Sequence, residues 1–226
     1  MIRKKLMLLA ALSIAAFSAS TTASATNVAV TGDVGTTGTG IHFTVPVAKD
    51  LNARFGVNYF DFSHSASTNN VNYDFKLKLN TWDALLDYHP FSSGFRLTGG
   101  LIYNANKIDA HAKPNGNGTY TLNGNVYSSA TAGNVDGSVD FRKLAPYVGL
   151  GYSSPIDQPG WGLSADAGVI FQGNPSTSLS NSNCSASAAA CAQLARDVAA
   201  ENQSLNDKVH NYQYYPVVRI GLMYRW

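Results

Sequence analysis

The sequence predicts an all-β protein, specifically an eight-stranded antiparallel transmembrane β-barrel with long extracellular loops. Three observations lead to this fold class. Charged residues make up only 13% of the 226 residues, about half of the usual share in soluble domains. Most of the chain consists of segments in which apolar and polar residues alternate, which is the period of strands. No segment beyond the N-terminal leader is apolar over the roughly 20 residues that a spanning helix needs, so a membrane protein built from this chain has to be a closed barrel.

The first 25 residues have the pattern of a secretory signal peptide. Arg3, Lys4 and Lys5 precede an apolar stretch from Leu6 to Phe17, and Ala23-Ser24-Ala25 resembles a cleavage site. The stretch is shorter than a spanning helix, and a retained anchor is the alternative. Cleavage leaves residues 26–226 as a single barrel domain with 13 basic and 14 acidic residues, a net charge of −1. This balance offers no basic surface to nucleic acid.

Two strands are expected from Thr39 to Val45 and from Leu51 to Tyr59, joined by a short turn. Each alternates apolar with polar residues. Bacterial single-chain barrels contain an even number of strands, and only seven are clear from alternation. The segment from Asn27 to Val34, which would fold back through residues 35–38, is the candidate for the eighth strand.

The segment from Val71 to Tyr88 alternates throughout, but the phase of the alternation slips by one residue near Asn80. Phe75 and Leu77 occupy odd positions, whereas Trp82, Ala84, Leu86 and Tyr88 occupy even ones. A β-bulge near Asn80 would explain the slip. After a turn from His89 to Gly94, the segment from Phe95 to Ala105 has the cleanest alternation in the chain.

Two long insertions interrupt the remaining strands. The first, from Asp109 to about Asp140, is polar and contains an Asn123-Gly124 pair between β-prone arms, which predicts a small hairpin with a type I′ turn. The second, from Gly173 to Asn211, is Ser/Asn-rich and then helix-prone, and we expect a loop with a short helix. Strands are expected at the segments 144–152, 161–171 and 218–226, and Pro146 requires a bulge or an unpaired position.

The apolar faces are expected to point outward, toward lipid. Aromatic residues cluster at the ends of these faces, as in the aromatic girdles of membrane barrels. The connections alternate between short turns (46–50, 89–94 and 155–160) and longer loops, the asymmetry between the periplasmic and extracellular sides. The opposite faces then line the lumen. The charged residues expected there are Arg54, Asp83, Asp87, Arg96, Asp166, Arg219 and Arg225.

The inward-facing charges have two interpretations. They could form the selectivity lining of a pore, with acidic groups attracting a cationic solute. Alternatively, they could pair into a network that fills the lumen, because an ion inside a narrow barrel needs a partner. Glycines at positions 40, 56, 100, 149, 151, 168 and 221 also face inward in this register, and their lack of side chains favours an open lumen.

Cys184 and Cys191 lie in a polar stretch of an exported chain, where an oxidising compartment favours a disulfide over two free thiols. Neither these cysteines nor the histidines have the spacing of a metal site. Asp61, His64 and Ser65 lie close in sequence, as do Asp109 and His111, but no motif fixes the geometry of a catalytic triad. We therefore expect no enzyme, no catalytic residue, no metal and no cofactor.

Several short motifs resemble the CarO-type outer-membrane proteins, over most of the mature chain. They are Val34-Gly35-Thr36-Thr37-Gly38, Ala145-Pro146-Tyr147, Trp161 with Gly173-Asn174-Pro175, and Tyr215-Pro216-Val217. Arg219, Gly221, Tyr224 and Trp226 resemble the carboxy-terminal signal that the barrel-assembly machinery reads, with Trp in place of the usual Phe. The resemblance implies an eight-stranded barrel that takes up small amino acids such as ornithine and admits carbapenem antibiotics.

From these features we expect a monomeric barrel in the bacterial outer membrane, surrounded by lipid and lipopolysaccharide and inserted by the barrel-assembly machinery. The expected function is a passive channel for small solutes such as basic amino acids. The alternative is a non-conducting barrel whose extracellular loops act as adhesive or partner-binding surfaces. An eight-stranded barrel is just wide enough for its own side chains, whereas the inward glycines remove side-chain volume, so the sequence leaves both functions open.

Overall fold

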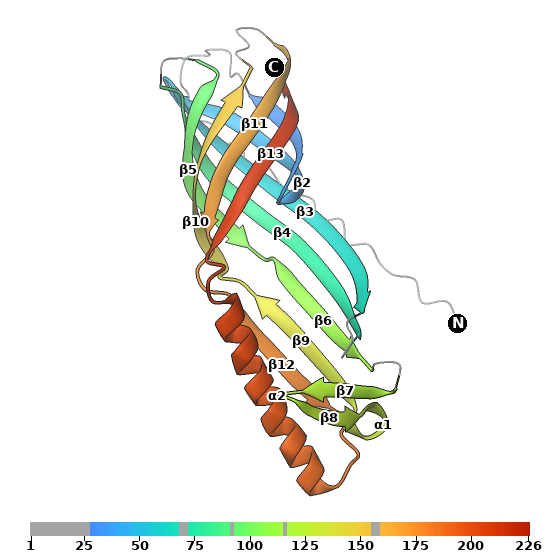
Figure 1. Cartoon of the computed structure of the whole chain (residues 1–226). Helices are drawn as coiled ribbons and strands as arrows, with labels where there is room; N and C mark the ends of the chain where they lie inside the picture. Colours follow the sequence, from blue (N-terminus) through green and yellow to red (C-terminus); the bar gives the residue numbers. More distant parts are fainter. Residues whose placement is uncertain (1–27, 68–71, 91–92, 115–116, 155–158) are drawn as a thin grey trace, which may run out of the picture.

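A narrow β-barrel continues at one end into a curved sheet flanked by a long helix, as the computed structural model in Figure 1 shows. The structure describes residues 28–67, 72–90, 93–114, 117–154 and 159–226. The expected signal peptide and Asn27 therefore lie outside the described residues.

Eight strands close the barrel. Each pairs antiparallel with the next, and β1 pairs with β13 to complete the ring. The expected eighth strand is confirmed, since it is β1. In order around the ring, the strands are β1 (Ala29–Gly35), β2 (Gly38–Ala48), β3 (Leu51–Ser67), β4 (Asn72–Tyr88), β5 (Phe95–Asn104), β10 (Leu144–Ser153), β11 (Gly160–Phe171) and β13 (Tyr214–Arg225).

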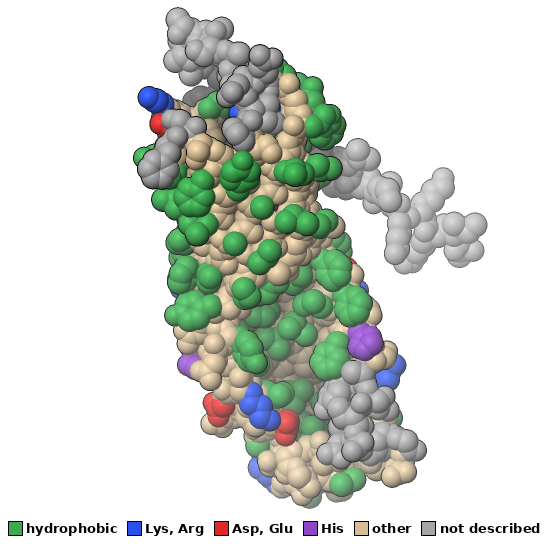
Figure 2. All heavy atoms as spheres, turned by 45° about the horizontal axis from the view of Figure 1, so that its top comes forward, with side chains coloured by type: hydrophobic (Ala, Val, Ile, Leu, Met, Phe, Trp, Pro, Cys, Tyr) green, Lys and Arg blue, Asp and Glu red, His purple; other side chains and the backbone are tan. Residues whose placement is uncertain are grey.

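The outer wall of the barrel is apolar and the interior is polar, as expected. Phe43, Trp82 and Leu150 are each more than half exposed on the outer wall, and apolar side chains cover the face of the barrel seen in Figure 2. Contiguous exposure of this kind indicates a surface in contact with lipid rather than water. The inward positions of the same strands carry buried charges, which are described below.

The two ends of the barrel differ. Both the chain end at Trp226 and the short turns around residues 49–50 and 93–94 lie at the end drawn uppermost in Figure 1. Trp161, Tyr224 and Trp226 pack edge-to-face there, with ring centroids 5.1 Å apart in each pair. Outer-membrane barrels have short turns on the periplasmic side and longer loops on the extracellular side. The curved sheet and helix are therefore on the extracellular side.

The expected bulge near Asn80 is wrong. Strand β4 pairs with β3 without a register shift over all 17 residues, so Asp83 and Leu77 share one face of the same strand. What changes at Asn80 is the environment of that face. From residue 81 to 88 this face lines the lumen, whereas before Asn80 β4 pairs with a strand outside the barrel, and the face carries the apolar Phe75 and Leu77. The opposite face changes from apolar Trp82 to charged Lys78.

The two insertions are ordered structure, contrary to the expectation of loops. Strand β6 (Lys107–Lys113) takes over from β5 along the edge of β4, and β9 (Asn134–Asp140) and β12 (Ser176–Ser182) extend the sheet further. Helix α2 (Ala188–Val209) is 22 residues long and runs along this sheet. The helix is longer than the short helix that we expected, because its apolar positions are sparse and give a weak helical pattern.

The expected hairpin is confirmed. Strands β7 (Thr119–Leu122) and β8 (Asn125–Ser128) are joined by Asn123 and Gly124, whose φ values of 48° and 79° fit a type I′ turn. The short helix α1 (Ser129–Ala132) follows. We call the segments 60–67, 72–79, 107–140 and 176–209 together the outer extension. It has a core of its own, formed by Tyr120, Leu122, Ala132, Val135, Leu194 and Val198.

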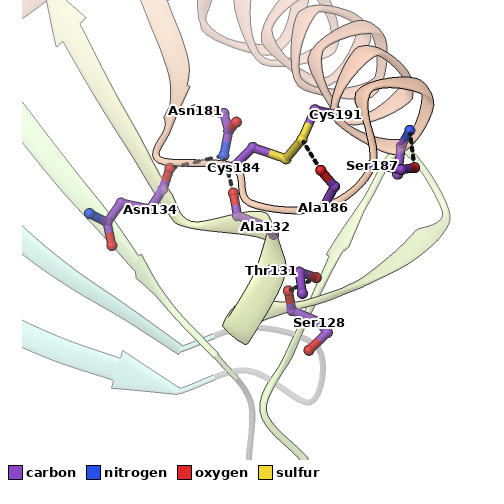
Figure 3. The surroundings of a disulfide bond; sticks show 10 residues. Ser128, Thr131, Ala132, Asn134, Asn181, Cys184, Ala186, Ser187 and Cys191 are labelled. Atoms are coloured by element: carbon purple, nitrogen blue, oxygen red, sulfur yellow. Dashed lines mark hydrogen bonds between the residues drawn. A yellow bond between two sulfur atoms is a disulfide. The ribbon is translucent and has the colours of Figure 1, made fainter.

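The expected disulfide is present. Cys184 and Cys191 are joined, with their Cα atoms 6.0 Å apart, and they tie the end of β12 to the first turn of α2 (Figure 3). Ser187 caps that helix by accepting a hydrogen bond from the Ala190 N–H. Asn181 donates to the carbonyls of Ala132 and Asn134 beside the disulfide. These contacts connect the start of α2 to its sheet.

Candidate functional site

The lumen is crossed by a cluster of four charged side chains near its periplasmic half. Arg54 on β3 lies 2.9 Å from Asp87 (Nε to Oδ2) and 3.0 Å from Asp166 (Nη1 to Oδ2). Arg96 on β5 donates to Asp166 at 2.9 Å and to Ser164 at 3.0 Å. Because β3 and β11 stand on opposite sides of the ring, the Arg54–Asp166 pair spans the full width of the lumen.

A second cluster fills the lumen nearer the outer mouth. His42 Nδ1 lies 2.5 Å from Asp33 Oδ2, and His42 Nε2 lies 2.9 Å from Asp83 Oδ2. Arg219 on β13 reaches across to Asp83 on the opposite wall, with Nη1 3.2 Å from Oδ2. Asn58 also donates to Asp83, at 3.1 Å. This cluster again joins strands on opposite sides of the barrel.

Almost no water reaches these side chains. Arg54, Asp87, Arg96 and Arg219 are each at least 95% buried. Charges buried to this extent are tolerated only when they are paired and hydrogen-bonded. Six of the seven charges expected in the lumen, all but Arg225, belong to the two clusters. Of the two interpretations, the geometry favours the network that fills the lumen.

The inward glycines make room for large side chains and not for a pore. A Cβ on Gly56 would lie 2.0 Å from His42 Cδ2, and one on Gly151 would lie 2.6 Å from Arg96 Nε. At both Gly149 and Gly168 a Cβ would come within 2.5 Å of the Tyr147 hydroxyl. The expectation that these glycines widen the lumen is therefore wrong, because the side chains of His42, Arg96 and Tyr147 occupy the space.

Arg225 lies beside the first cluster, at the end of the lumen where the chain ends. It is half-buried at the periplasmic mouth, where it lines a space of only about 10 Å³ together with Asn52, His89 and Ser153. A space of that size is about enough for one water molecule. The periplasmic mouth is therefore narrow as well.

Sequence reasoning missed two members of the network, Asp33 and His42. Asp33 lies on β1, whose assignment rested on strand counting, so its orientation could not be inferred. His42 alternates with apolar Ile41 and Phe43 and so shares the inward face. That alternation was the available signal, because a histidine on a lumen face beside carboxylates needs a partner.

The buried network leaves some polar atoms without a protein partner among the described residues. Oδ1 of Asp33 and Oδ1 of Asp83 are buried and accept no hydrogen bond there. The clusters together hold four carboxylates, three guanidinium groups and His42. Buried acceptors of this kind are normally satisfied by ordered water. The lumen is thus filled mainly by side chains, with polar sites left for single waters.

The residues considered for catalysis do not form a catalytic set. Asp61 and His64 alternate on β3 and so point to opposite faces of the sheet, and Asp61 pairs with Lys76. Lys107 donates to Asp109 at 2.8 Å, and this hydrogen bond lowers the pKa of Asp109 and raises that of Lys107. His111 contacts Asp136 on the exposed face. These pairs belong to a charged outer surface in contact with water.

The described ranges contain neither a candidate metal site nor a candidate membrane-spanning helix. No group of three or more His, Cys, Asp or Glu residues there could hold a metal ion. None of the helices in those ranges is long and apolar enough to cross a membrane.

Comparison with known proteins identifies the fold. No protein-family model and no curated protein matches the chain by sequence. Among solved structures, CarO2 of Acinetobacter baumannii matches 89% of this chain and 99% of its own at 22% identity, with a TM-score of 0.57. CarO of the same organism matches 89% of this chain and 98% of its own at 22% identity, with a TM-score of 0.55. The expected resemblance is confirmed at the level of the fold.

Proposed function

We propose, from the premise that this chain is an outer-membrane β-barrel with the CarO fold, that the barrel is closed and that its outer extension binds a partner at the cell surface. The observation that carries the proposal is the Arg54–Asp166 pair, which joins opposite walls of the lumen through buried hydrogen bonds. A solute path along the axis has to break this pair. The outer extension, in contrast, lies outside the barrel (Figure 1).

The free-energy cost of opening the lumen supports a closed barrel. Removing one partner of a buried ion pair costs about 3–5 kcal/mol, because the other charge stays buried and uncompensated. Two such clusters lie in series along the axis, one around Arg54 and one around Asp83. Simultaneous spontaneous opening of both would therefore be rare. Porins that conduct freely have 16 or more strands and a much wider lumen.

The outer extension has the features of a binding module. It is held by its own apolar core and by the Cys184–Cys191 disulfide, so it does not depend on the lumen for its structure. Its outward face is lined with paired charges such as Lys113 and Asp74. Its inward face is apolar and continues toward the barrel mouth. This construction supports a role at the cell surface, the adhesive or partner-binding alternative that the sequence left open.

The second candidate function is the passive channel for small solutes, such as basic amino acids (ornithine), with carbapenems as further solutes. One observation favours it. The two clusters hold one more carboxylate than guanidinium groups, and the unpaired Oδ1 atoms of Asp33 and Asp83 face the lumen. Such carboxylates would attract a cation if the network rearranged. In this candidate the network acts as a gate.

The lipid and protein surroundings of the barrel belong to the same proposal. Outer-membrane lipid and lipopolysaccharide would contact the apolar wall, and the chain would act as a monomer. Tyr224 and Trp226 lie at the periplasmic rim, where a carboxy-terminal assembly signal would be read before insertion. Arg219 and Gly221 of that segment face the lumen in the folded barrel. They would then serve assembly first and lumen packing afterwards.

The two candidates are separated by reconstitution of the purified full chain. We expect no current steps in planar bilayers and no ornithine entry into liposomes, with a general porin in the same lipid as the positive control. Steps or ornithine entry with the wild-type chain would overturn the closed barrel and support the channel. The double variant Arg54→Ala/Asp166→Ala removes both partners of the first cross-lumen pair and keeps the Arg219–Asp83 pair, so it tests whether the first cluster is needed to keep the barrel shut.

A matched deletion tests the outer extension. Replacing residues 176–209 with a short linker removes β12 and α2 and leaves the eight barrel strands intact. If the barrel is closed by its lumen network, this deletion leaves conductance at zero. Conductance that appears only after the deletion would mean that the extension is a plug, which contradicts the proposal.

A further inference from the structure

An apolar cavity of about 240 Å³ lies inside the outer extension, between α2 and its sheet. The sheet supplies Phe75, Ile108 and Ala110 to its wall, and the C-terminal half of α2 supplies Leu205 and Val209. The cavity is separate from the lumen clusters, which lie inside the barrel. It is concave and lined mainly by carbon, the general character of small-molecule sites.

The cavity exists because the two halves of α2 pack differently. In the first half, Leu194 and Val198 are fully buried in the core of the extension. In the second half, Leu205 and Val209 are only half-buried. Two of the sheet residues that line the cavity, Ala110 and Gly137, are small, so space remains between helix and sheet.

Polar contacts hold the second half of α2 at this distance. The Thr177 N–H donates to Asn206 Oδ1 at 2.8 Å, and the Thr177 hydroxyl donates to Asn202 Oδ1 at 2.9 Å. These bonds attach the helix to β12 at the edge of the sheet. Collapse of the helix onto the small residues would break them, so the space persists even though protein interiors are normally close-packed.

The charge of the cavity lining favours an uncharged ligand. Among the described residues that line the cavity, Glu201 is the one carboxylate, and none is Lys, Arg or His. Its Oε2 accepts a hydrogen bond from the Asn123 N–H at 3.2 Å. A carboxylate or phosphate bound here would meet Glu201 with no cation to offset the repulsion. An uncharged ligand meets no such penalty.

The volume of the cavity and the apolar surface that continues from it fit a small apolar molecule. An engineered apolar cavity of about 150 Å³ takes benzene, so this cavity has room for a bicyclic ring or a short alkyl chain. The apolar face continues from the cavity toward the barrel mouth, where Phe60 and Phe62 are 41% and 49% exposed. Such exposed apolar surface on the water side of a membrane protein commonly marks a binding surface.

The geometry points to a binding site in the outer extension for uncharged apolar small molecules of about the size of a bicyclic aromatic ring, enclosed between α2 and the sheet of β4, β6 and β9. This inference rests on the proposed function, in which the extension and not the lumen does the binding. It adds the chemical class of the ligand.

A matched pair of probes tests the inference. 2-Naphthol is uncharged at pH 7, and 2-naphthoate has the same rings with a carboxylate. With the full chain in lipid nanodiscs, titration calorimetry should show saturable one-to-one binding of 2-naphthol above the signal from empty nanodiscs. Binding of 2-naphthoate should be at least about tenfold weaker, a difference of about 1.4 kcal/mol.

Variants locate the site. Ala110→Phe fills the cavity from the sheet and Leu205→Trp fills it from the helix, and each should abolish 2-naphthol binding. Two independent walls are used so that one misfolded variant does not decide the result. Ala195→Phe makes the same substitution at an exposed position in the first half of α2 that does not line the cavity, and it should leave binding unchanged. Glu201→Gln should strengthen 2-naphthoate binding severalfold and leave 2-naphthol unaffected.

Two outcomes overturn the inference. One is a 2-naphthol signal no larger than that of empty nanodiscs, and the other is binding that survives both folded cavity-filling variants. Either outcome leaves the closed barrel untouched, because conductance is measured separately. Conversely, conductance by the wild-type chain would overturn the proposed function while 2-naphthol binding could still be present.

Discussion

Arg54 on β3 and Asp166 on β11 connect opposite walls of the barrel through two hydrogen bonds, of 3.0 and 3.1 Å. The two side chains meet directly inside the lumen, so the pair acts as a brace between β3 and β11. Arg219 and Asp83 form a second brace toward the outer mouth, at 3.2 Å. The barrel is thus stabilised from inside by charge as well as by its ladder of backbone hydrogen bonds.

Removing one end of the first brace should strongly destabilise the barrel. Arg54→Ala leaves the buried carboxylates of Asp87 and Asp166 with Arg96 as their one remaining guanidinium neighbour in the cluster, and the expected loss is about 3–5 kcal/mol in the free energy of unfolding. The measurement is urea unfolding in lipid vesicles, followed by tryptophan fluorescence of the barrel. The variant Lys78→Ala breaks a partly exposed pair with Asp109, which keeps Lys107 as a partner, and should cost no more than about 1 kcal/mol. Equal losses in the two variants would contradict the brace.

Gly56 should be intolerant of a side chain, in contrast to Gly32. Gly56→Ala places a methyl group against the His42 ring, and overpacking of this kind typically costs about 1–3 kcal/mol. Gly32 faces the lipid, and a Cβ there meets nothing within 4 Å. Gly32→Ala should therefore leave the free energy of unfolding nearly unchanged. Urea unfolding in lipid vesicles measures both variants. An unchanged free energy of unfolding in Gly56→Ala would mean that the lumen has unused space.

The barrel could be predicted from the sequence because its signal is local. Alternation along each strand shows which side faces lipid, and residues such as Phe43 and Arg54 point as the period of two requires. Strand β1 could be assigned only by the need for an even count. Its Asp33 therefore escaped notice as a lumen residue.

The outer extension could not be predicted, because its signal depends on contacts distant in sequence. On β4 the same face carries Asp83 in the lumen and Phe75 in the extension, so a change of surroundings resembles a change of phase. The sequence of β4 itself does not indicate that its pairing partner changes from β5 to β6 near Asn80. Likewise, the role of the inward glycines depends on large side chains such as His42 and Tyr147 that lie over them in the folded barrel. Whether a glycine opens or fills space is decided by those partners.

The disulfide should stabilise the extension and leave the barrel unaffected. Cys184 and Cys191 are separated by seven positions, and closing so short a loop contributes about 2–3 kcal/mol through the unfolded state. The double variant Cys184→Ser/Cys191→Ser should lower the urea midpoint of the helical circular-dichroism signal, which comes mainly from α2. Tryptophan fluorescence of the barrel should keep its midpoint. Dithiothreitol should reproduce the loss in the wild-type chain and have no effect on the variant.

Asp197 should make the attachment of α2 to the β7–β8 hairpin depend on pH. It accepts hydrogen bonds from the Tyr127 hydroxyl, from Asn123 at 3.1 Å and from Asn125 at 2.8 Å. The bond from Tyr127, followed by those from the two asparagines, lowers the pKa of Asp197 to about 2. Burial, together with the same bond, raises the pKa of Tyr127 to about 12.

The two shifts place the loss of stability at opposite ends of the pH scale. A lowered carboxyl pKa contributes stability above the unfolded value of about 4, and this contribution is lost as pH falls toward about 2. A raised tyrosine pKa contributes stability below about 10, which is lost as pH rises through about 12. The urea midpoint of the helical signal should therefore be flat between these limits and fall on both sides. Asp197→Asn should remove the acid slope, whereas Asp207→Asn, on the exposed side of α2, should retain it. An acid slope that persists in Asp197→Asn would assign the dependence to another group.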